Sequence, residues 1–210
     1  MNDHDQRPGP SRRALWDERH AAHEPIESFE PDPTLIAEIG SLPPGRALDL
    51  GAGDGRNAIW LAGRGWHVTA VDFSQVALDR GRVRAAAAGV DVDWRLADLQ
   101  EWSPATRGYD LVTLFFIHLP PDERRDVYAR AAAAVAPGGT LLIVGHDRTN
   151  LADGVGGPKD PDVLIEPGDI VADLAGFRID RAEVARREAT LGHGPIDAIV
   201  RAVRVTSSQR

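Results

Sequence analysis

The sequence predicts an α/β protein with one doubly wound, mostly parallel sheet and helices on both of its faces. Between positions 46 and 147, short apolar segments alternate with helix-like segments, which is typical of strand–helix–strand units with parallel strands. A strand followed by a glycine-rich loop and a helix stands at 48–62. The length of 210 residues suits a single domain with a small appendage.

The chain is expected to divide into a tail, a cap and this core domain. Residues 1–10 are polar and predict a disordered tail. Residues 11–40 predict an N-terminal helical cap, in which Pro33 opens a helix that Gly40 closes. Residues 41–206 form the core domain.

The first half of the core domain consists of short strands that lead into helices. Ser74 is a suitable N-cap and Gly89 a suitable C-cap for a helix at 74–89. The expected order is strand 46–50, helix 57–63, strand 66–73, helix 74–89 and strand 90–99.

The second half begins with a nearly continuous apolar strand, which suits burial on both faces. Asp122 is expected to cap the next helix, and the last two strands are expected to pair antiparallel at the sheet edge. The expected order is strand 109–119, helix 122–136, turn 137–139, strand 140–147, loop 148–168, helix 167–176 and strands 177–188 and 196–205.

Composition excludes several classes of protein and of partner. The chain has no cysteine, which excludes disulfides, thiolate metal sites and a cysteine nucleophile. It has 24 basic and 32 acidic residues with no basic cluster, so nucleic acid is not an expected partner. No apolar run is long enough for a membrane span, and the first residues do not resemble a secretory signal. We therefore expect a cytoplasmic monomer or homodimer that binds no membrane.

The glycine-rich loop predicts a nucleoside-binding crevice. Gly51, Gly53 and Gly55 follow the first strand and allow close backbone approach to a ligand. Taken alone, they also suit a tight turn. The dinucleotide-binding pattern G-x-G-x-x-G would need glycine at 56, where the chain has Arg56, and Asp49 would repel a pyrophosphate.

Two further acids stand at the ends of the next two strands. Asp72 can accept hydrogen bonds from both hydroxyls of a ribose, and Phe73 can lie against an adenine ring. Asp98 can accept from an adenine amino group, and the amide of Leu99 can reach a ring nitrogen. Asp98 could also be an ordinary turn residue.

The motifs LDLGAGDG, AVDFS, LADL, YDLVTLFFIHLP and APGGTLLIVGHD together resemble class I S-adenosylmethionine (SAM)-dependent methyltransferases. The resemblance covers about residues 45–147 and implies a seven-stranded sheet of order 3-2-1-4-5-7-6 with strand 7 antiparallel. It implies SAM as the methyl donor, S-adenosylhomocysteine as product, and 41–206 as the methyltransferase domain. The cofactor-binding residues that it implies are Asp49, Gly51, Ala52, Gly53, Asp72, Phe73, Asp98, Leu99, Phe115 and Trp16, the last as part of a lid.

The methyl acceptor is expected to be a small molecule such as a thiol, phenol or amine, because no large insertion follows the fifth strand. His118, His146 and Asp147 end the fourth and fifth strands and are the candidate catalytic residues. Histidine is a common general base near neutral pH. Each could instead be a satisfied polar or turn residue. No metal is expected, because no set of ligands with suitable spacing is present.

Two other functions stay open from the sequence. The first is an NAD-type oxidoreductase, which Arg56 and the absence of a Tyr-x-x-x-Lys pair disfavour. The second is a SAM-binding protein without catalytic activity.

Overall fold

The computed structural model describes residues 17–18, 30–187 and 194–206. The predicted tail, Trp16 and most of the predicted cap before residue 30 lie outside the described residues. None of the described helices is long and apolar enough to cross a membrane.

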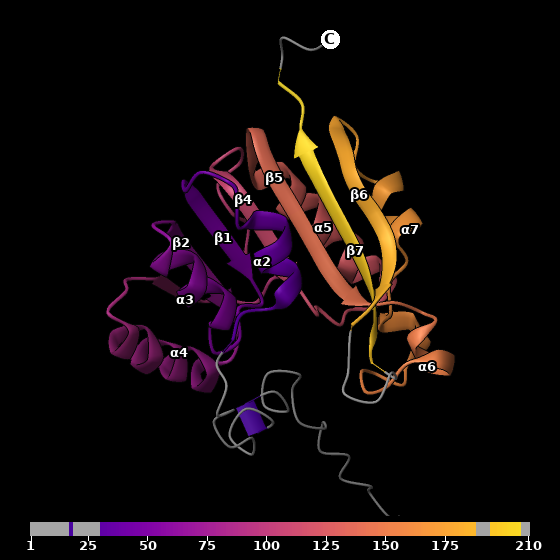
Figure 1. Ribbon diagram of the computed structural model, residues 1–210, viewed down its shortest axis with the longest axis horizontal. Coiled ribbons are helices and arrows are strands. Elements are labelled where there is room, and N and C mark those ends of the chain that lie inside the picture. Colours follow the sequence, from indigo (N-terminus) through magenta and orange to yellow (C-terminus); the bar gives the residue numbers. More distant parts are fainter. Residues whose placement is uncertain (1–16, 19–29, 188–193, 207–210) are drawn as a thin grey trace, which may run out of the picture.

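One seven-stranded sheet forms the centre of the molecule in the order β3-β2-β1-β4-β5-β7-β6, which confirms the predicted topology (Figure 1). Neighbours from β3 to β5 pair in parallel, whereas β7 is antiparallel to both β5 and β6. The strands are β1 (Arg46–Leu50), β2 (His67–Asp72), β3 (Asp93–Leu96), β4 (Tyr109–Phe115), β5 (Val135–His146), β6 (Phe177–Arg186) and β7 (Ile196–Arg204).

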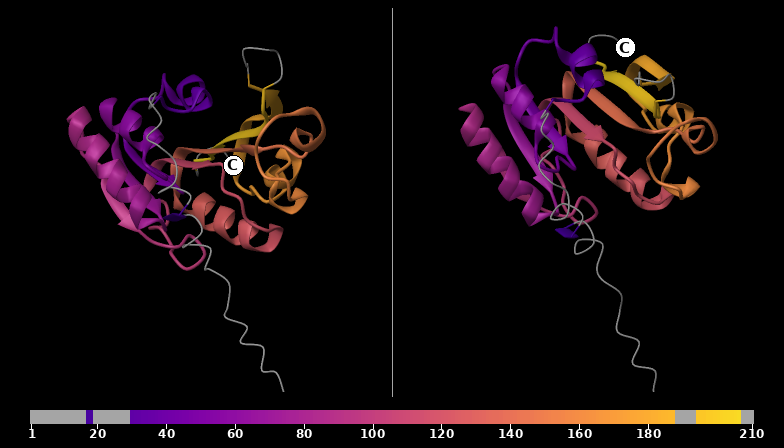
Figure 2. Two further views of the ribbon diagram at one scale, coloured as in Figure 1. Left: turned by 90° about the horizontal axis from the view of Figure 1, so that it is seen from below. Right: turned by 60° about the horizontal axis from the view of Figure 1, so that its bottom comes forward.

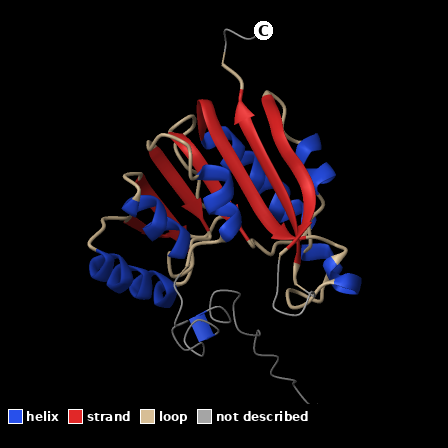
Figure 3. Ribbon diagram, in the orientation of Figure 1, coloured by secondary structure: helices blue, strands red, loops and turns tan. Residues whose placement is uncertain are grey.

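Helices cover both faces of this sheet, as Figures 2 and 3 show. On one face, α2 and α3 bury apolar side chains against β1, β2 and β4. On the opposite face, α5 packs against β4 and β5, and α7 packs against β6 and β7. The helices are α2 (Pro33–Ile39), α3 (Arg56–Gly63), α4 (Gln75–Ala88), α5 (Pro121–Ala134), α6 (Asn150–Asp153) and α7 (Pro167–Ala172), with a 3-10 helix at Pro161–Val163.

The predicted helix caps at both ends of α4 are present. The hydroxyl of Ser74 accepts from the amide of Ala77 at 3.2 Å, and Gly89 ends the helix with a φ of 68°. In α2, the carboxylate of Asp32 accepts from the amide of Thr34, and Gly40 is the C-cap. These local signals set both helix ends because each satisfies an otherwise unpaired backbone group.

Several predicted boundaries were wrong. Asp122 lies inside the first turn of α5, which begins at Pro121 because proline is preorganised for the first helical position. The predicted turn at 137–139 lies within β5, where the pairing with β4 shifts register between Tyr109 and Leu111. The strand predicted at 109–119 ends at Phe115, and the loop predicted at 148–168 contains two short helical turns.

The carboxyl ends of β1, β2, β4 and β5 meet along one edge of the sheet, the lower edge in Figure 1. The antiparallel β7 begins at this same edge, because His146 at the end of β5 pairs with Asp197 at the start of β7. Loops at this edge therefore bring together side chains from the whole length of the core domain.

Candidate functional site

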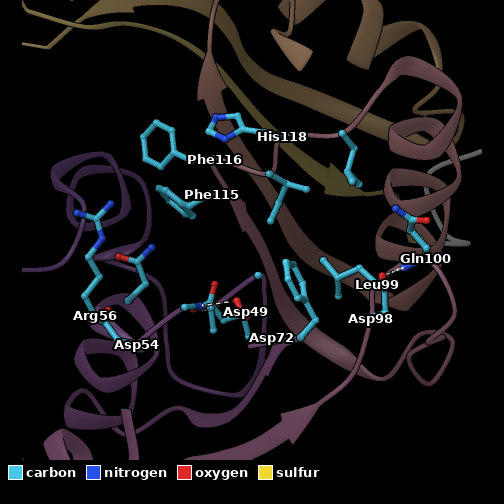
Figure 4. Close-up of a pocket in the computed structure, with 17 residues that line it drawn as sticks. Asp49, Asp54, Arg56, Asp72, Asp98, Leu99, Gln100, Phe115, Phe116 and His118 are labelled. Atoms are coloured by element: carbon cyan, nitrogen blue, oxygen red, sulfur yellow. Dashed lines mark hydrogen bonds between the residues drawn. The ribbon is translucent and has the colours of Figure 1, made fainter. Parts of the chain in front are cut away.

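A pocket of about 340 Å³ lies at this edge of the sheet, beside the loop that joins β1 to α3 (Figure 4). In Figure 4, Asp49 and Asp72 lie at one side of the pocket, and Phe116 and His118 lie at the other. The described residues predicted from the sequence that line it are Asp49, Gly51, Ala52, Gly53, Asp72, Phe73, Asp98, Leu99, Phe115 and His118. His146 and Asp147 are not among the residues that line it.

The glycine loop has a backbone that ordinary side chains would strain. Gly51, Gly53 and Gly55 have φ values of 69°, 56° and 84°, in the left-handed region that glycine tolerates best. A Cβ on Gly51 would lie 2.1 Å from Ile117, and one on Gly55 would lie 2.2 Å from the ring of Trp94. The left-handed backbone therefore requires glycine at all three positions, and the rigid ring of Trp94 leaves no space for a side chain at Gly55.

Asp49 is a buried carboxylate at the floor of the pocket. It is the last but one residue of β1, and 2% of its surface is exposed. Its Oδ1 accepts from the hydroxyl of Thr113 at 2.7 Å. Its Oδ2 forms no hydrogen bond within the part of the chain that the structure describes. Burial raises the pKa of Asp49 to about 6, and the nearby charge of Asp72 adds to this, whereas Thr113 and Arg56 oppose it. A buried carboxylate oxygen in this position is suited to a cationic ligand.

Asp72 supports the glycine loop from the end of β2. One carboxylate oxygen accepts from the amide of Gly53 and the other from the amide of Ser74, each at 2.8 Å. Each carboxylate oxygen can accept more than one hydrogen bond, so these contacts leave capacity for ligand hydroxyls. Asp72 thus ties the loop to the start of α4 and faces the pocket at the same time.

Asp98 and Arg56 line the pocket at opposite sides, as Figure 4 shows. Asp98 accepts from the amide of Gln100 at 2.9 Å, which orients the turn after β3. Arg56 lines the pocket and forms an ion pair with Asp32 at 3.3 Å. Asp32 is fully buried and caps α2, so this pair connects α2 to the pocket. The guanidinium of Arg84 pairs with Asp54 in the glycine loop.

The opposite wall begins with an unusual backbone at Phe116, which follows β4. Its φ is 56°, a conformation that costs free energy for a residue other than glycine and that is often found at functional sites. It directs Ile117 and His118 toward the pocket. The ring of His118 stacks on that of His146, with centroids 5.7 Å apart and planes inclined by 9°.

The structure pairs His146 with a residue that the sequence interpretation missed. The Nδ1 of His146 lies 3.0 Å from Oδ1 of Asp197, and the Nε of Arg187 lies 2.6 Å from Oδ2 of the same carboxylate. The signal available in the sequence was an acidic residue within the apolar segment 196–200. Asp147 instead accepts from the amide and hydroxyl of Thr149, so it holds the turn after β5.

Metal-ligating side chains do not gather in the described part of the chain. No group of three or more His, Asp or Glu residues there is placed to hold a metal ion.

Comparisons with known proteins point to one family. The family model described as "Methyltransferase domain" matches residues 47–139. The "Ubiquinone biosynthesis O-methyltransferase" of Hahella chejuensis is 30% identical over 132 residues, which is 61% of this chain and 55% of that protein. The chain spans about half the length of the curated relatives that it matches.

Two solved structures share the fold at low sequence identity. A protein studied for "Conversion of a Disulfide Bond into a Thioacetal Group during Echinomycin Biosynthesis" is 22% identical with a TM-score of 0.73, covering 93% of this chain and 94% of that one. The N-methyltransferase NodS from Bradyrhizobium japonicum, in complex with S-adenosylhomocysteine, is 15% identical with a TM-score of 0.70, covering 90% and 97%.

Proposed function

Because the chain belongs to the class I SAM-dependent methyltransferases, we propose that it transfers the methyl group of SAM to a small-molecule acceptor. SAM, when bound, supplies an electrophilic methyl group on a sulfonium. The protein then has to hold the acceptor in line with that methyl group and exclude water. The residues that line the pocket are suited to these tasks.

The observation that carries this proposal is Oδ2 of Asp49 at the floor of the pocket, which has no hydrogen-bond partner among the residues that the structure describes. A buried carboxylate without a partner is costly, and a cationic group such as the ammonium of SAM would compensate it. Asp72 would hold the ribose, and Asp98 with Leu99 would hold the adenine. These acids also disfavour NAD, because they would repel its pyrophosphate.

The wall opposite the acids favours a small acceptor over a macromolecule. Phe115, Phe116 and Ile117 line it, and apolar and aromatic side chains are common in pockets for small organic ligands. The net charge of −8 would oppose a nucleic acid. A phenol, an amine or a thiol fits this wall.

Isothermal titration of the purified protein with SAM, S-adenosylhomocysteine and NAD tests the cofactor. We expect binding of the first two and not of NAD, with a stabilisation of about 2.7 kcal/mol at 100-fold excess over Kd. Turnover is then measured as S-adenosylhomocysteine formed with a panel of phenols, amines and thiols. The proposal fails if millimolar SAM does not bind. If SAM binds but no acceptor is methylated, a binding protein without catalytic activity becomes the better interpretation.

A further inference from the structure

We infer that His146, oriented by Asp197 and Arg187, is the general base of the site and that its acceptor is a phenol-type hydroxyl. This inference rests on the proposed methyl transfer and deepens it. It assigns a chemical role to three residues from the antiparallel end of the sheet, none of which is among the residues that line the pocket.

The group is built by the pairing of β5 with β7. His146 and Asp197 are opposite each other in the antiparallel register, so their side chains lie side by side on the same face of the sheet. Arg187 follows β6, and its amide donates to the carbonyl of Pro195 at 2.9 Å just before β7. Strand β5 therefore supplies His146 as the base, and β7 supplies the carboxylate of Asp197. The residue that follows β6, Arg187, supplies the positive charge that balances this carboxylate.

Asp197 sets the tautomer of the His146 ring. The carboxylate is 1% exposed, and Arg187 at 2.6 Å already balances its charge. A neutral imidazole can therefore donate its Nδ1–H to Asp197 at 3.0 Å without having to carry a charge itself. In that tautomer the proton sits on Nδ1, so Nε2 bears the lone pair that a general base needs.

The surroundings of His146 point to an aromatic acceptor. Phe116, which lines the pocket, lies 5.0 Å from the His146 ring, and the guanidinium of Arg187 lies 5.0 Å from the Phe116 ring. The ring of His118 stacks on that of His146. The His146 side chain keeps 10% of its surface exposed. Flat rings on this side favour a flat acceptor, whose hydroxyl would reach Nε2.

The reaction balances without a further reactant. The hydroxyl proton of the phenol passes to Nε2 of His146, and the phenolate oxygen forms a bond to the methyl carbon. The bond between sulfur and that carbon breaks, and its electron pair stays on sulfur to give a neutral thioether. The imidazolium then releases its proton to water. A phenol, with an ordinary pKa of about 10, needs such a base at neutral pH, whereas an aromatic thiol ionises more readily.

The first test reads the tautomer and the ionisation of a bound phenol without turnover. Ring-nitrogen NMR of the S-adenosylhomocysteine complex should show His146 as the neutral Nδ1–H tautomer, and the Nε2–H form would overturn the inference. The same complex is titrated with 4-nitrophenol, which reports phenolate by absorbance. In the wild type, we expect bound 4-nitrophenol to have a higher phenolate fraction than free 4-nitrophenol at the same pH. In His146→Gln, this increase should be lost. An equal rise in both proteins, or no binding of 4-nitrophenol, contradicts the inference.

The second test separates deprotonation from structure by comparing phenol with thiophenol as methyl acceptors. In His146→Gln and Asp197→Asn, kcat for phenol should fall by about 10²-fold or more, with SAM affinity within about twofold of wild type. Thiophenol should be methylated within about threefold of the wild-type rate, since it needs no base. The matched control is Asp180→Asn, which removes a carboxylate paired with Arg178 on β6, away from the pocket.

The outcomes separate this inference from the proposed function. If wild-type protein does not bind SAM, the proposed function fails. If SAM binds but phenol is not an acceptor, or if phenol turnover is unchanged in both variants, only the inference fails. An equal loss of kcat for phenol and thiophenol would also overturn the inference, because it would show that His146 and Asp197 have a structural role.

Discussion

Replacing Asp49 by asparagine should stabilise the ligand-free protein at neutral pH and weaken its binding of SAM. Burial raises the pKa of Asp49 from its ordinary 3.8 to about 6. Below pH 3.8 the carboxyl is protonated in both folded and unfolded chains, so its ionisation does not lower the free energy of unfolding. As pH rises toward the folded pKa, the unfolded chain ionises first, so stability is lost through this window and the loss is complete above about pH 6.

The size of the effect follows from this pKa difference. At about 1.36 kcal/mol for each pKa unit, the ionised Asp49 lowers the free energy of unfolding by about 3 kcal/mol at pH 7.5 and by about 1.6 kcal/mol at pH 5. Asparagine does not ionise, and its side-chain oxygen can still accept from Thr113. The stability advantage of Asp49→Asn should therefore grow by about 1.4 kcal/mol between pH 5 and pH 7.5.

Urea denaturation of both proteins at the two pH values measures this difference, and all other titrating groups cancel in the comparison. Calorimetry of the same pair should show SAM affinity reduced by about 10- to 150-fold in Asp49→Asn, from the loss of a charge-assisted contact. If the difference in free energy of unfolding between the two proteins does not change with pH, Asp49 does not carry a buried charge at neutral pH. Unchanged SAM affinity would show that Asp49 does not meet the ammonium group.

Three other substitutions test the pocket. Asp72→Ala should cost about 1.5–3 kcal/mol of SAM binding by calorimetry and lower Tm, because two backbone amides lose their acceptor; unchanged affinity would leave Asp72 a purely structural role. Gly51→Ala should destabilise by about 1–3 kcal/mol in urea denaturation, mainly through strain at a φ of 69° and partly through contact with the end of the Ile117 side chain; adding Ile117→Ala should recover only the smaller part, and full recovery would contradict the assignment to backbone strain. Asp32→Ala should cost about 1 kcal/mol of stability as a lost N-cap and weaken SAM binding through Arg56; unchanged values of both would contradict the link between α2 and the pocket.

Much of the site followed from local patterns in the chain. The alternation of apolar segments with helical ones predicted the parallel strands, and in parallel strands every carboxyl end reaches the same edge of the sheet. Asp49, Asp72 and Asp98 stand at such ends, and all three line the pocket. Caps such as Ser74 were also readable, because a cap and the amide that it satisfies are a few residues apart.

Element boundaries that depend on neighbouring strands were predicted less well. The glycine and proline at 137–139 are local turn signals, yet this segment runs on into β5, with a local break in its register with β4. A shift of register between two strands far apart in the sequence leaves no local pattern. The left-handed φ of Phe116 is likewise set by packing against neighbouring strands, since nothing in its own side chain favours it.

The sequence alone was sufficient for the fold class and for placing three acids at the pocket, because each depends on residues close together in the chain or on general rules of parallel sheets. The strand order was implied by the resemblance to a known family. It identified His146 but joined it to the adjacent Asp147. Only the antiparallel pairing of β5 with β7 brings Asp197, 51 residues away, within 3.0 Å of the imidazole. The partner of a side chain in a sheet is decided by register across strands, and that register exists only in the folded molecule.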